Sequence, residues 1–190
     1  MAKIEKGKVQ FEREETVWGY IRGKAQWAKV LEPGEYGSFE VDLYVEDDVM
    51  EDYKSKAEGV AQVAHDGMLE VGKKGTKQDE FHKEKDGKEY LKFKLPAENW
   101  KGEPNKVDIY DKHGDKQPEW DKLIGNGSEV IIKYKISPYY MASSKVAGAS
   151  VRFYAMQVVN LVEYQSGGES GFGDTTGGQA DTPSNESEDF

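Results

Sequence analysis

The sequence contains no cysteine, and its three histidines lie far apart. The absence of cysteine excludes disulfide bonds, cysteine-ligated zinc and thiol catalysis, and it suits a reducing compartment. Hydrophobic residues make up 36% of the 190 residues, and no apolar run approaches the length that spans a membrane. The first residues carry charges of both signs and lack the apolar core of a signal peptide. We therefore expect a soluble intracellular protein with no membrane partner.

Basic residues are also missing from the last part of the chain. The segment Ser166–Phe190 has six acidic residues and many glycines, but no lysine or arginine. Subtracting these six charges from the formal net charge of −10 leaves −4 for residues 1–165. With only Phe172 and Phe190 as aromatic residues, the segment cannot bury enough apolar surface to offset its chain entropy. We predict a disordered acidic tail over residues 165–190.

Two long strands are predicted immediately before this tail, over Glu129–Ile136 and Ser150–Val162. Side chains alternate between the two faces of a strand, so each of these strands has one apolar face that fits a core. The opposite faces carry cations and a ring, at Lys133, Lys135, Arg152 and Tyr154.

Upstream of these strands, the spacing of hydrophobic residues predicts a β-hairpin, one helix and two further strands. Side chains that alternate with a period of two mark the strands, among them the series Ala25, Trp27 and Lys29, and helical spacing marks the helix. The predicted elements are a hairpin that turns at Glu32–Gly37 and continues as the strand Phe39–Val45, a helix from Asp47 or Asp48 to Asp66–Gly67, a polar loop Gly72–Gly87, a strand Tyr90–Leu95 and a short strand Val107–Tyr110.

This order of elements predicts a mainly β protein with an OB-fold, a five-stranded antiparallel Greek-key barrel. Several strands separated by turns imply a barrel or a sandwich. One helix inserted between the strands favours the barrel. We predict an N-terminal arm over residues 1–16, the barrel over residues 17–164 and the acidic tail after it.

The outward strand faces combine cations with aromatic rings. Single-stranded nucleic acid needs cations for its phosphates and ring faces for its bases, and each stacked base contributes about 1–3 kcal/mol. Lysine and tyrosine also favour exposed strand faces for no functional reason. Three strands that carry cations in one phase, in an acidic protein, favour nucleic-acid binding. The candidate DNA-binding residues are Lys24, Trp27, Lys29, Tyr44, Tyr90, Lys92, Lys94, Lys133, Lys135, Arg152 and Tyr154.

The tip of the acidic tail places carboxylates beside an aromatic residue, at Glu186, Glu188, Asp189 and Phe190. A flexible acidic segment can mimic a phosphate backbone and occupy the protein's own groove, or it can bind a basic partner. The alternative is a tail that only aids solubility, which is the commoner use of such a composition. The terminal phenylalanine argues against that alternative, because solubility gives no reason for an apolar end.

Three further motifs give no support for catalysis, so we predict no catalytic residue, no metal ligand and no cofactor. Gly67–Lys74 has the spacing of a phosphate-binding P-loop until Lys74, which stands where serine or threonine is required. The acidic residues of Asp108–Asp115 match no calcium loop and are typical of a turn. The three histidines lack the partners of a catalytic triad.

Three segments carry a likeness to one protein family. They are Trp27–Pro33 leading to the strand Val41–Leu43, Gly125–Ser128 before a basic strand, and Gly148–Val158. In their order, and with the acidic tail that ends in phenylalanine, they resemble bacteriophage single-stranded DNA-binding, or helix-destabilising, proteins over most of residues 20–164.

The resemblance implies an OB-fold that coats single strands during phage DNA replication, recombination and repair, in the cytoplasm of an infected bacterial host cell. It also implies a tail that contacts replisome proteins, such as DNA polymerase and helicase–primase, and competes with DNA for the groove. It allows for a homodimer. Many barrels of this class place the helix after the third strand, so either the family varies or one strand around Val17–Ile21 is unaccounted for.

Two other classes of protein remain open. A carbohydrate-binding β-sandwich module also exposes tryptophan and tyrosine, but it needs neither rows of lysine nor an acidic tail. A metal-dependent nuclease would cleave single strands when magnesium is added. Steep salt dependence separates nucleic-acid binding from sugar binding.

Overall fold

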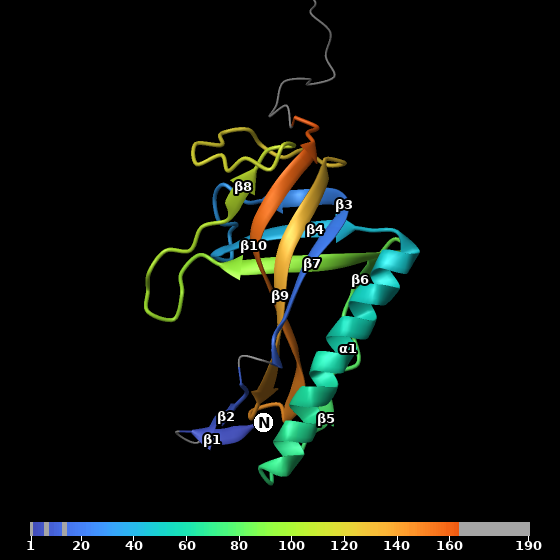
Figure 1. Cartoon of the computed structure of the whole chain (residues 1–190), viewed down its shortest axis with the longest axis vertical. Coiled ribbons are helices and arrows are strands. Elements are labelled where there is room, and N and C mark those ends of the chain that lie inside the picture. Colours follow the sequence, from blue (N-terminus) through green and yellow to red (C-terminus); the bar gives the residue numbers. More distant parts are fainter. Residues whose placement is uncertain (1, 6–7, 13–14, 164–190) are drawn as a thin grey trace, which may run out of the picture.

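A curled sheet of long strands forms the body of the molecule, and a helix runs along one side of it (Figure 1). The computed structural model describes residues 2–5, 8–12 and 15–163. Within these residues there are ten strands and one helix. They are β1 (Lys3–Glu5), β2 (Lys8–Gln10), β3 (Val17–Lys29), β4 (Ser38–Tyr44), α1 (Asp47–Glu70), β5 (Thr76–Lys77), β6 (Lys83–Lys85), β7 (Lys88–Pro96), β8 (Asp108–Tyr110), β9 (Glu129–Met141) and β10 (Val146–Asn160).

The strand pairing makes a half-barrel. The order in the main sheet is β5-β10-β9-β3-β4-β7-β6, and β8 lies parallel beside β10. The five strands β3, β4, β7, β9 and β10 carry the barrel, and the sheet curls until β10 approaches β7. This is the expected mainly β OB-fold, so the predicted fold class is confirmed. The helix lies between β4 and β7, which are the second and third strands of the barrel.

Strand β3 shows that no separate strand is unaccounted for around Val17–Ile21. It runs unbroken over thirteen residues and includes the segment Val17–Ile21. The expected alternation of Ala25 with Trp27 and Lys29 on one face is wrong. A β-bulge interrupts the register between Gln26 and Lys29, and Trp27 has a φ of 51°. The bulge adds a residue to one strand, so Ala25 is fully buried whereas Trp27 is 59% exposed.

Three aromatic rings fill the core beneath the sheet. Tyr134 of β9 is 1% exposed, and its ring centroid lies 5.6 Å from that of Tyr53 and 5.7 Å from that of Phe93. A side chain at Gly19 of β3 would overlap the Tyr134 ring, so glycine is required there. Burial raises the pKa of the Tyr134 hydroxyl. With Tyr134 pointing inward, the lysine on each side of it points outward.

Helix α1 packs along β9 and β10 and continues beyond the predicted end at Asp66–Gly67. Gly67 lies inside the helix, where a side chain would meet Ala2 and Phe11 of the N-terminal arm. The chain leaves the helix at Gly72, whose φ of 72° is the left-handed conformation that glycine favours. Among the described residues, no helix has the length and apolar character needed to cross a membrane.

The remaining boundaries also differ from those that the sequence predicted. Strand β9 extends to Met141 and β10 begins at Val146, because the two continue to pair beyond the barrel through Pro138 and Ala149. The predicted loop Gly72–Gly87 contains the short strands β5 and β6. β5 pairs with β10 and β6 pairs with β7, so the loop is attached to the sheet at both ends.

Candidate nucleic-acid interface

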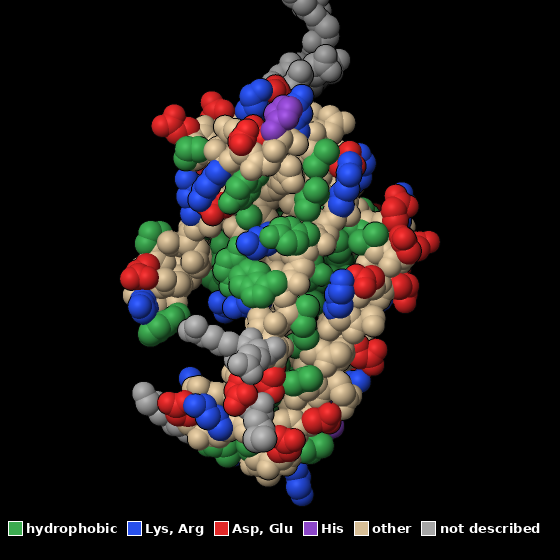
Figure 2. All heavy atoms as spheres, viewed as in Figure 1, with side chains coloured by type: hydrophobic (Ala, Val, Ile, Leu, Met, Phe, Trp, Pro, Cys, Tyr) green, Lys and Arg blue, Asp and Glu red, His purple; other side chains and the backbone are tan. Residues whose placement is uncertain are grey.

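Rings and lysines meet on the outer face of β3, β9 and β10. In the ladder between β3 and β9, Trp18 lies opposite Lys135 and Tyr20 lies opposite Lys133. Tyr154 reaches the same surface from β10. We call these five residues the aromatic–lysine cluster. Figure 2 shows hydrophobic and basic side chains side by side in the centre of this face, whereas acidic side chains gather along α1 and at the lower end.

The distances within the cluster are those of ring stacking and cation–π contact. The Trp18 and Tyr154 ring centroids lie 5.2 Å apart at an interplanar angle of 45°. The Lys133 Nζ lies 5.6 Å from the Trp18 ring centroid and 5.8 Å from that of Tyr20. The Lys135 Nζ lies 5.7 Å from the centroids of both Trp18 and Tyr154. Each ammonium is therefore held between two rings, at a range where the ring faces attract it.

The cluster combines exposed rings with cations that are paired with no acid among the described residues. Trp18 is 53% exposed and Tyr20 is 69% exposed, although both belong to a central strand. Within the described residues, neither Lys133 nor Lys135 forms an ion pair. Arg152 lies opposite Lys135 in the ladder between β9 and β10 and adds a third cation to the same face. The surface therefore offers ring faces and positive charge together.

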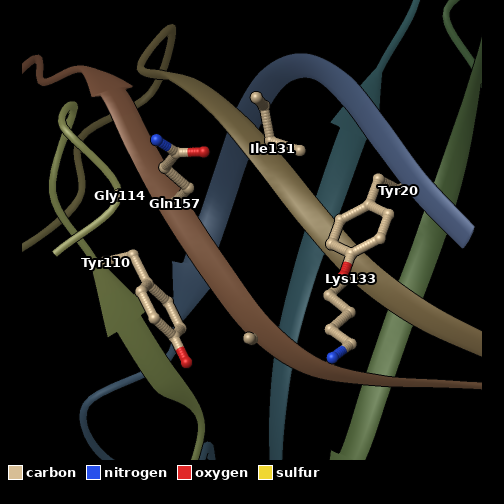
Figure 3. Close-up of a pocket in the computed structure, with 7 residues that line it drawn as sticks. Tyr20, Tyr110, Gly114, Ile131, Lys133 and Gln157 are labelled. Carbon is tan, nitrogen blue, oxygen red and sulfur yellow. The ribbon is translucent and has the colours of Figure 1, made fainter. Parts of the chain in front are cut away.

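A hollow of about 260 Å³ lies beside the cluster (Figure 3). Tyr20 and Lys133 border it on one side, and Tyr110 of β8 borders it on the other. Ala155 and Gln157 of β10 lie between them. The sheet pairing explains the shape, because β8 runs beside β10 and brings Tyr110 opposite Gln157.

A second group of charges lies where β3 and β9 begin to pair. The Arg22 Nη2 and Nε each lie 2.8 Å from Oε1 of Glu129, and the Lys24 Nζ lies 3.8 Å from Oε2. The hydrogen bond from Arg22 lowers the pKa of Glu129. Lys24, a predicted DNA-binding residue, is therefore shared with an acid on the same outer face.

The predicted row on β7 has a different environment. The Lys92 Nζ lies 3.3 Å from Oε2 of Glu40 and 3.1 Å from Oδ1 of Asp42, and the Lys94 Nζ lies 3.6 Å from Glu40 Oε2. Burial alone would lower the pKa of Lys92, but hydrogen bonds and charge from Asp42 and Glu40 outweigh it and raise that pKa. Both lysines line a separate hollow of about 250 Å³ between β7 and β10. The structure therefore does not bring this row together with the aromatic–lysine cluster.

The other predicted rings and cations lie apart from the cluster. Tyr44 and Tyr90 stack on each other with centroids 5.5 Å apart at an angle of 26°. Trp27 protrudes at the bulge of β3, where the Lys85 Nζ lies 5.9 Å from its ring centroid. Lys29 is exposed opposite Glu40 at the end of β3. The four predicted partner-binding residues of the tail, Glu186, Glu188, Asp189 and Phe190, lie outside the described residues.

Sequence reasoning missed Trp18, Tyr20, Arg22 and Tyr110 as members of this face. The signal was present for the first three, because they share one phase of β3. Its use required the pairing of β3 with β9, which joins residues more than a hundred positions apart. Tyr110 follows from the parallel pairing of β8 with β10, which no local pattern indicates.

The motifs that the sequence analysis set aside have ordinary structural roles. The carboxylate of Asp111 accepts hydrogen bonds from the backbone N–H groups of His113 and Asp115 and from the side chain of Gln117, which closes the predicted turn. Among the residues that the structure describes, no three acidic or histidine side chains gather as a metal site would require. The first residues of Gly67–Lys74 form the last turn of α1.

Comparison with known proteins gives a match by structure. No protein-family model and no curated protein sequence matches this chain. The single-stranded DNA-binding protein gp2.5 of bacteriophage T7 superposes with a TM-score of 0.64 and 20% sequence identity, over 88% of this chain and 100% of its own. This chain has the fold of that protein.

A second phage protein has the same fold. The single-stranded DNA-binding protein from bacteriophage Enc34 superposes with a TM-score of 0.54 and 12% identity, over 87% of this chain and 92% of its own. The Enc34 protein in complex with single-stranded DNA gives a TM-score of 0.53 and 13% identity, over 85% of this chain and 95% of its own. At these identities the comparison establishes the fold alone.

Proposed function

We propose that this protein binds single-stranded DNA without sequence preference and coats it, with no catalytic step. The observation that carries the proposal is the aromatic–lysine cluster. It presents exposed rings to bases and unpaired cations to phosphates on one face of an OB-fold. The solved structures with this fold include phage single-stranded DNA-binding proteins, one of them in complex with single-stranded DNA.

The cluster suits an extended strand of DNA better than a duplex. Every base has a ring face that stacks on an aromatic side chain, and this contact carries no sequence information. In a duplex the ring faces are stacked on one another and are not available to Trp18 or Tyr20. Lys133, Lys135 and Arg152 supply the phosphate contacts, which are equally independent of sequence.

A salt titration tests this proposal. Binding of a fluorescein-labelled oligothymidylate is followed by anisotropy between 50 and about 300 mM NaCl, with a hairpin duplex as the competitor. We expect affinity for the single strand to fall steeply as salt rises, because bound phosphates release counterions. Equal affinity for the duplex, or affinity for oligosaccharides that salt does not change, would contradict it. Magnesium-stimulated cleavage of the labelled strand would instead support a nuclease.

The proposed setting is phage DNA replication, recombination and repair in the cytoplasm of an infected bacterial cell. In this proposal the acidic tail contacts DNA polymerase and helicase–primase through Glu186, Glu188, Asp189 and Phe190, and the protein is able to form homodimers. The support is the acidic composition of the tail, its aromatic end and the fold shared with phage proteins. Deletion of the chain after Tyr164 should tighten DNA binding at low salt, because it removes a competitor for the lysines. Unchanged affinity would refute the competition.

A further inference from the structure

The hollow beside the cluster is built from two successive rungs of the outer face of the sheet. One rung contains Ala155 of β10 opposite Lys133 of β9, which in turn lies opposite Tyr20 of β3. The next contains Tyr110 of β8, Gln157 of β10 and Ile131 of β9. Because the small side chain of Ala155 lies among much larger ones, the surface sinks at that point.

The hollow has room for one nucleobase. Its volume of about 260 Å³ is many times the roughly 10–15 Å³ that a single water molecule needs. Tyr20 and Tyr110 stand on opposite sides of it (Figure 3). Lys133, which also contacts the Trp18 ring, joins the hollow to the aromatic–lysine cluster. A strand bound at the cluster therefore passes the mouth of the hollow.

Gln157 gives the hollow a hydrogen-bonding group. Its Nε2 donates only a long hydrogen bond of 3.4 Å to the Lys112 carbonyl, and among the described residues its Oε1 accepts none. In Figure 3 the nitrogen points to the loop that contains Gly114 and the oxygen points to the side of Ile131. That loop is fixed, because the Asp111 carboxylate accepts hydrogen bonds from its backbone. The carboxamide is tethered to this loop by that one long hydrogen bond, so it can turn over and has bonding capacity left.

A carboxamide has an unusual property towards nucleobases. It presents one acceptor and one donor side by side. The Watson–Crick edge of each of the four bases also offers a donor next to an acceptor, and a half-turn of the amide exchanges their order. One glutamine can thus pair with any unpaired base, whereas in a duplex the same edge is occupied by the opposite base.

We propose that the hollow takes one base of the bound strand and that the Gln157 carboxamide hydrogen-bonds its Watson–Crick edge. This inference rests on the proposed function and adds a base-recognition site to it. Gln157 recognises that a base is unpaired, whichever base it is. Hydrogen bonding by Gln157 then discriminates against duplex DNA directly, in addition to the stacking on Trp18.

The test compares two oligonucleotides of equal length, oligothymidylate and the same strand with every thymine methylated at N3. The methyl group blocks the Watson–Crick edge and leaves the ring face and the backbone charge unchanged. Wild-type protein should bind the methylated strand about threefold to tenfold more weakly, as expected for one or two hydrogen bonds. The Gln157→Leu variant should bind both strands alike.

A second variant and two controls keep this test independent of folding. Ala155→Leu fills the hollow without removing a polar group, so it should also abolish the difference between the strands. Tyr36→Ala removes a ring that is 86% exposed on the hairpin turn, and it should keep the wild-type ratio. Trp18→Ala should lower the affinity for both strands by the same factor. Melting curves establish that each variant is folded.

Each outcome separates this inference from the proposed function. If wild-type protein binds both strands equally, or if Gln157→Leu keeps the wild-type ratio, the hollow does not recognise the unpaired edge. Single-strand binding itself would still stand in either case. If wild-type protein binds neither strand, the proposed function fails and this inference fails with it.

Discussion

Lys133 and Lys135 on β9 lie against rings, whereas Lys92 and Lys94 on β7 lie against carboxylates. In sequence the two pairs are alike, because both alternate with buried residues in a barrel strand. The neighbouring strands make the difference. Strand β3 presents Trp18 and Tyr20 to the first pair, and β4 presents Glu40 and Asp42 to the second. The side chains of the neighbouring strand therefore decide whether an exposed lysine can bind a ligand or is already held in an ion pair.

The largest effect should come from removing the ring at the centre of the cluster. Trp18→Ala should weaken binding of oligothymidylate by about 5-fold to 150-fold, since a stacked base contributes about 1–3 kcal/mol. Fluorescence anisotropy at low salt measures it. Tyr36→Ala is the matched control and should bind like the wild type. A Trp18→Ala variant that keeps wild-type affinity would place the DNA elsewhere.

The two lysine pairs should differ in their salt dependence. Replacing both Lys133 and Lys135 by alanine should lower the slope of log affinity against log salt by about 1.4, because each phosphate contact to a single strand contributes about 0.7. Replacing Lys92 and Lys94 should leave the slope unchanged, since both are already paired with acids. Equal slopes for the two double variants would remove the distinction between the rows.

Replacing Glu129 should free Arg22 and Lys24 from their ion pairs, so that both can contact DNA. Glu129→Gln removes the acid that holds Arg22 and Lys24, so affinity for the single strand should rise by about twofold to fivefold, with a steeper salt slope. The hydrogen bond from Arg22 lowers the pKa of Glu129, so the wild-type carboxylate stays charged until the pH falls below its ordinary value of 4.5. Wild-type affinity should therefore not reach that of the variant at neutral pH. Unchanged affinity in the variant would show that these cations do not meet DNA.

The smallest effect should appear in stability. Lys92→Ala leaves Glu40 and Asp42, whose side chains are only 15% and 14% exposed, without their shared partner. A loss of about 1 kcal/mol corresponds to a fall in Tm of about 2–4 °C for a protein of this size. Lys135→Ala removes contacts with two partly exposed rings but leaves no acid without a partner, so its Tm should fall by less in thermal melts followed by circular dichroism. A larger fall for Lys135→Ala would reverse this assignment.

The fold could be predicted from periodicity, because alternation marks most of the barrel strands and helical spacing marks α1. The errors lie where non-local contacts decide. A bulge at Trp27 changes the phase of β3, and Gly67, the predicted end of the helix, lies inside it and packs against the N-terminal arm. Pairing also carries β9 past its predicted end and starts β10 before its predicted beginning.

The site could be predicted only in part, for the same reason. Lys133, Lys135, Arg152 and Tyr154 follow from the phase of two adjacent strands. Glu40 and Asp42 share the outward phase of β4, so the sequence did contain the acids that pair with Lys92. Which lysine row they face depends on the order of the strands in the sheet, and one sequence read locally does not state that order.

The pairing of β3 with β9 also sets when the protein becomes able to bind. Trp18 and Lys135 are neighbours only across this ladder, with more than a hundred residues of chain between them. A ribosome-bound chain that ends before β9 therefore has Trp18 and Tyr20 without Lys133 and Lys135. In the proposed function DNA binds only the folded sheet, so it should raise the Tm by an amount that grows with the logarithm of its concentration over its Kd. In the proposed function a growing chain does not bind single strands until synthesis of the barrel is almost complete.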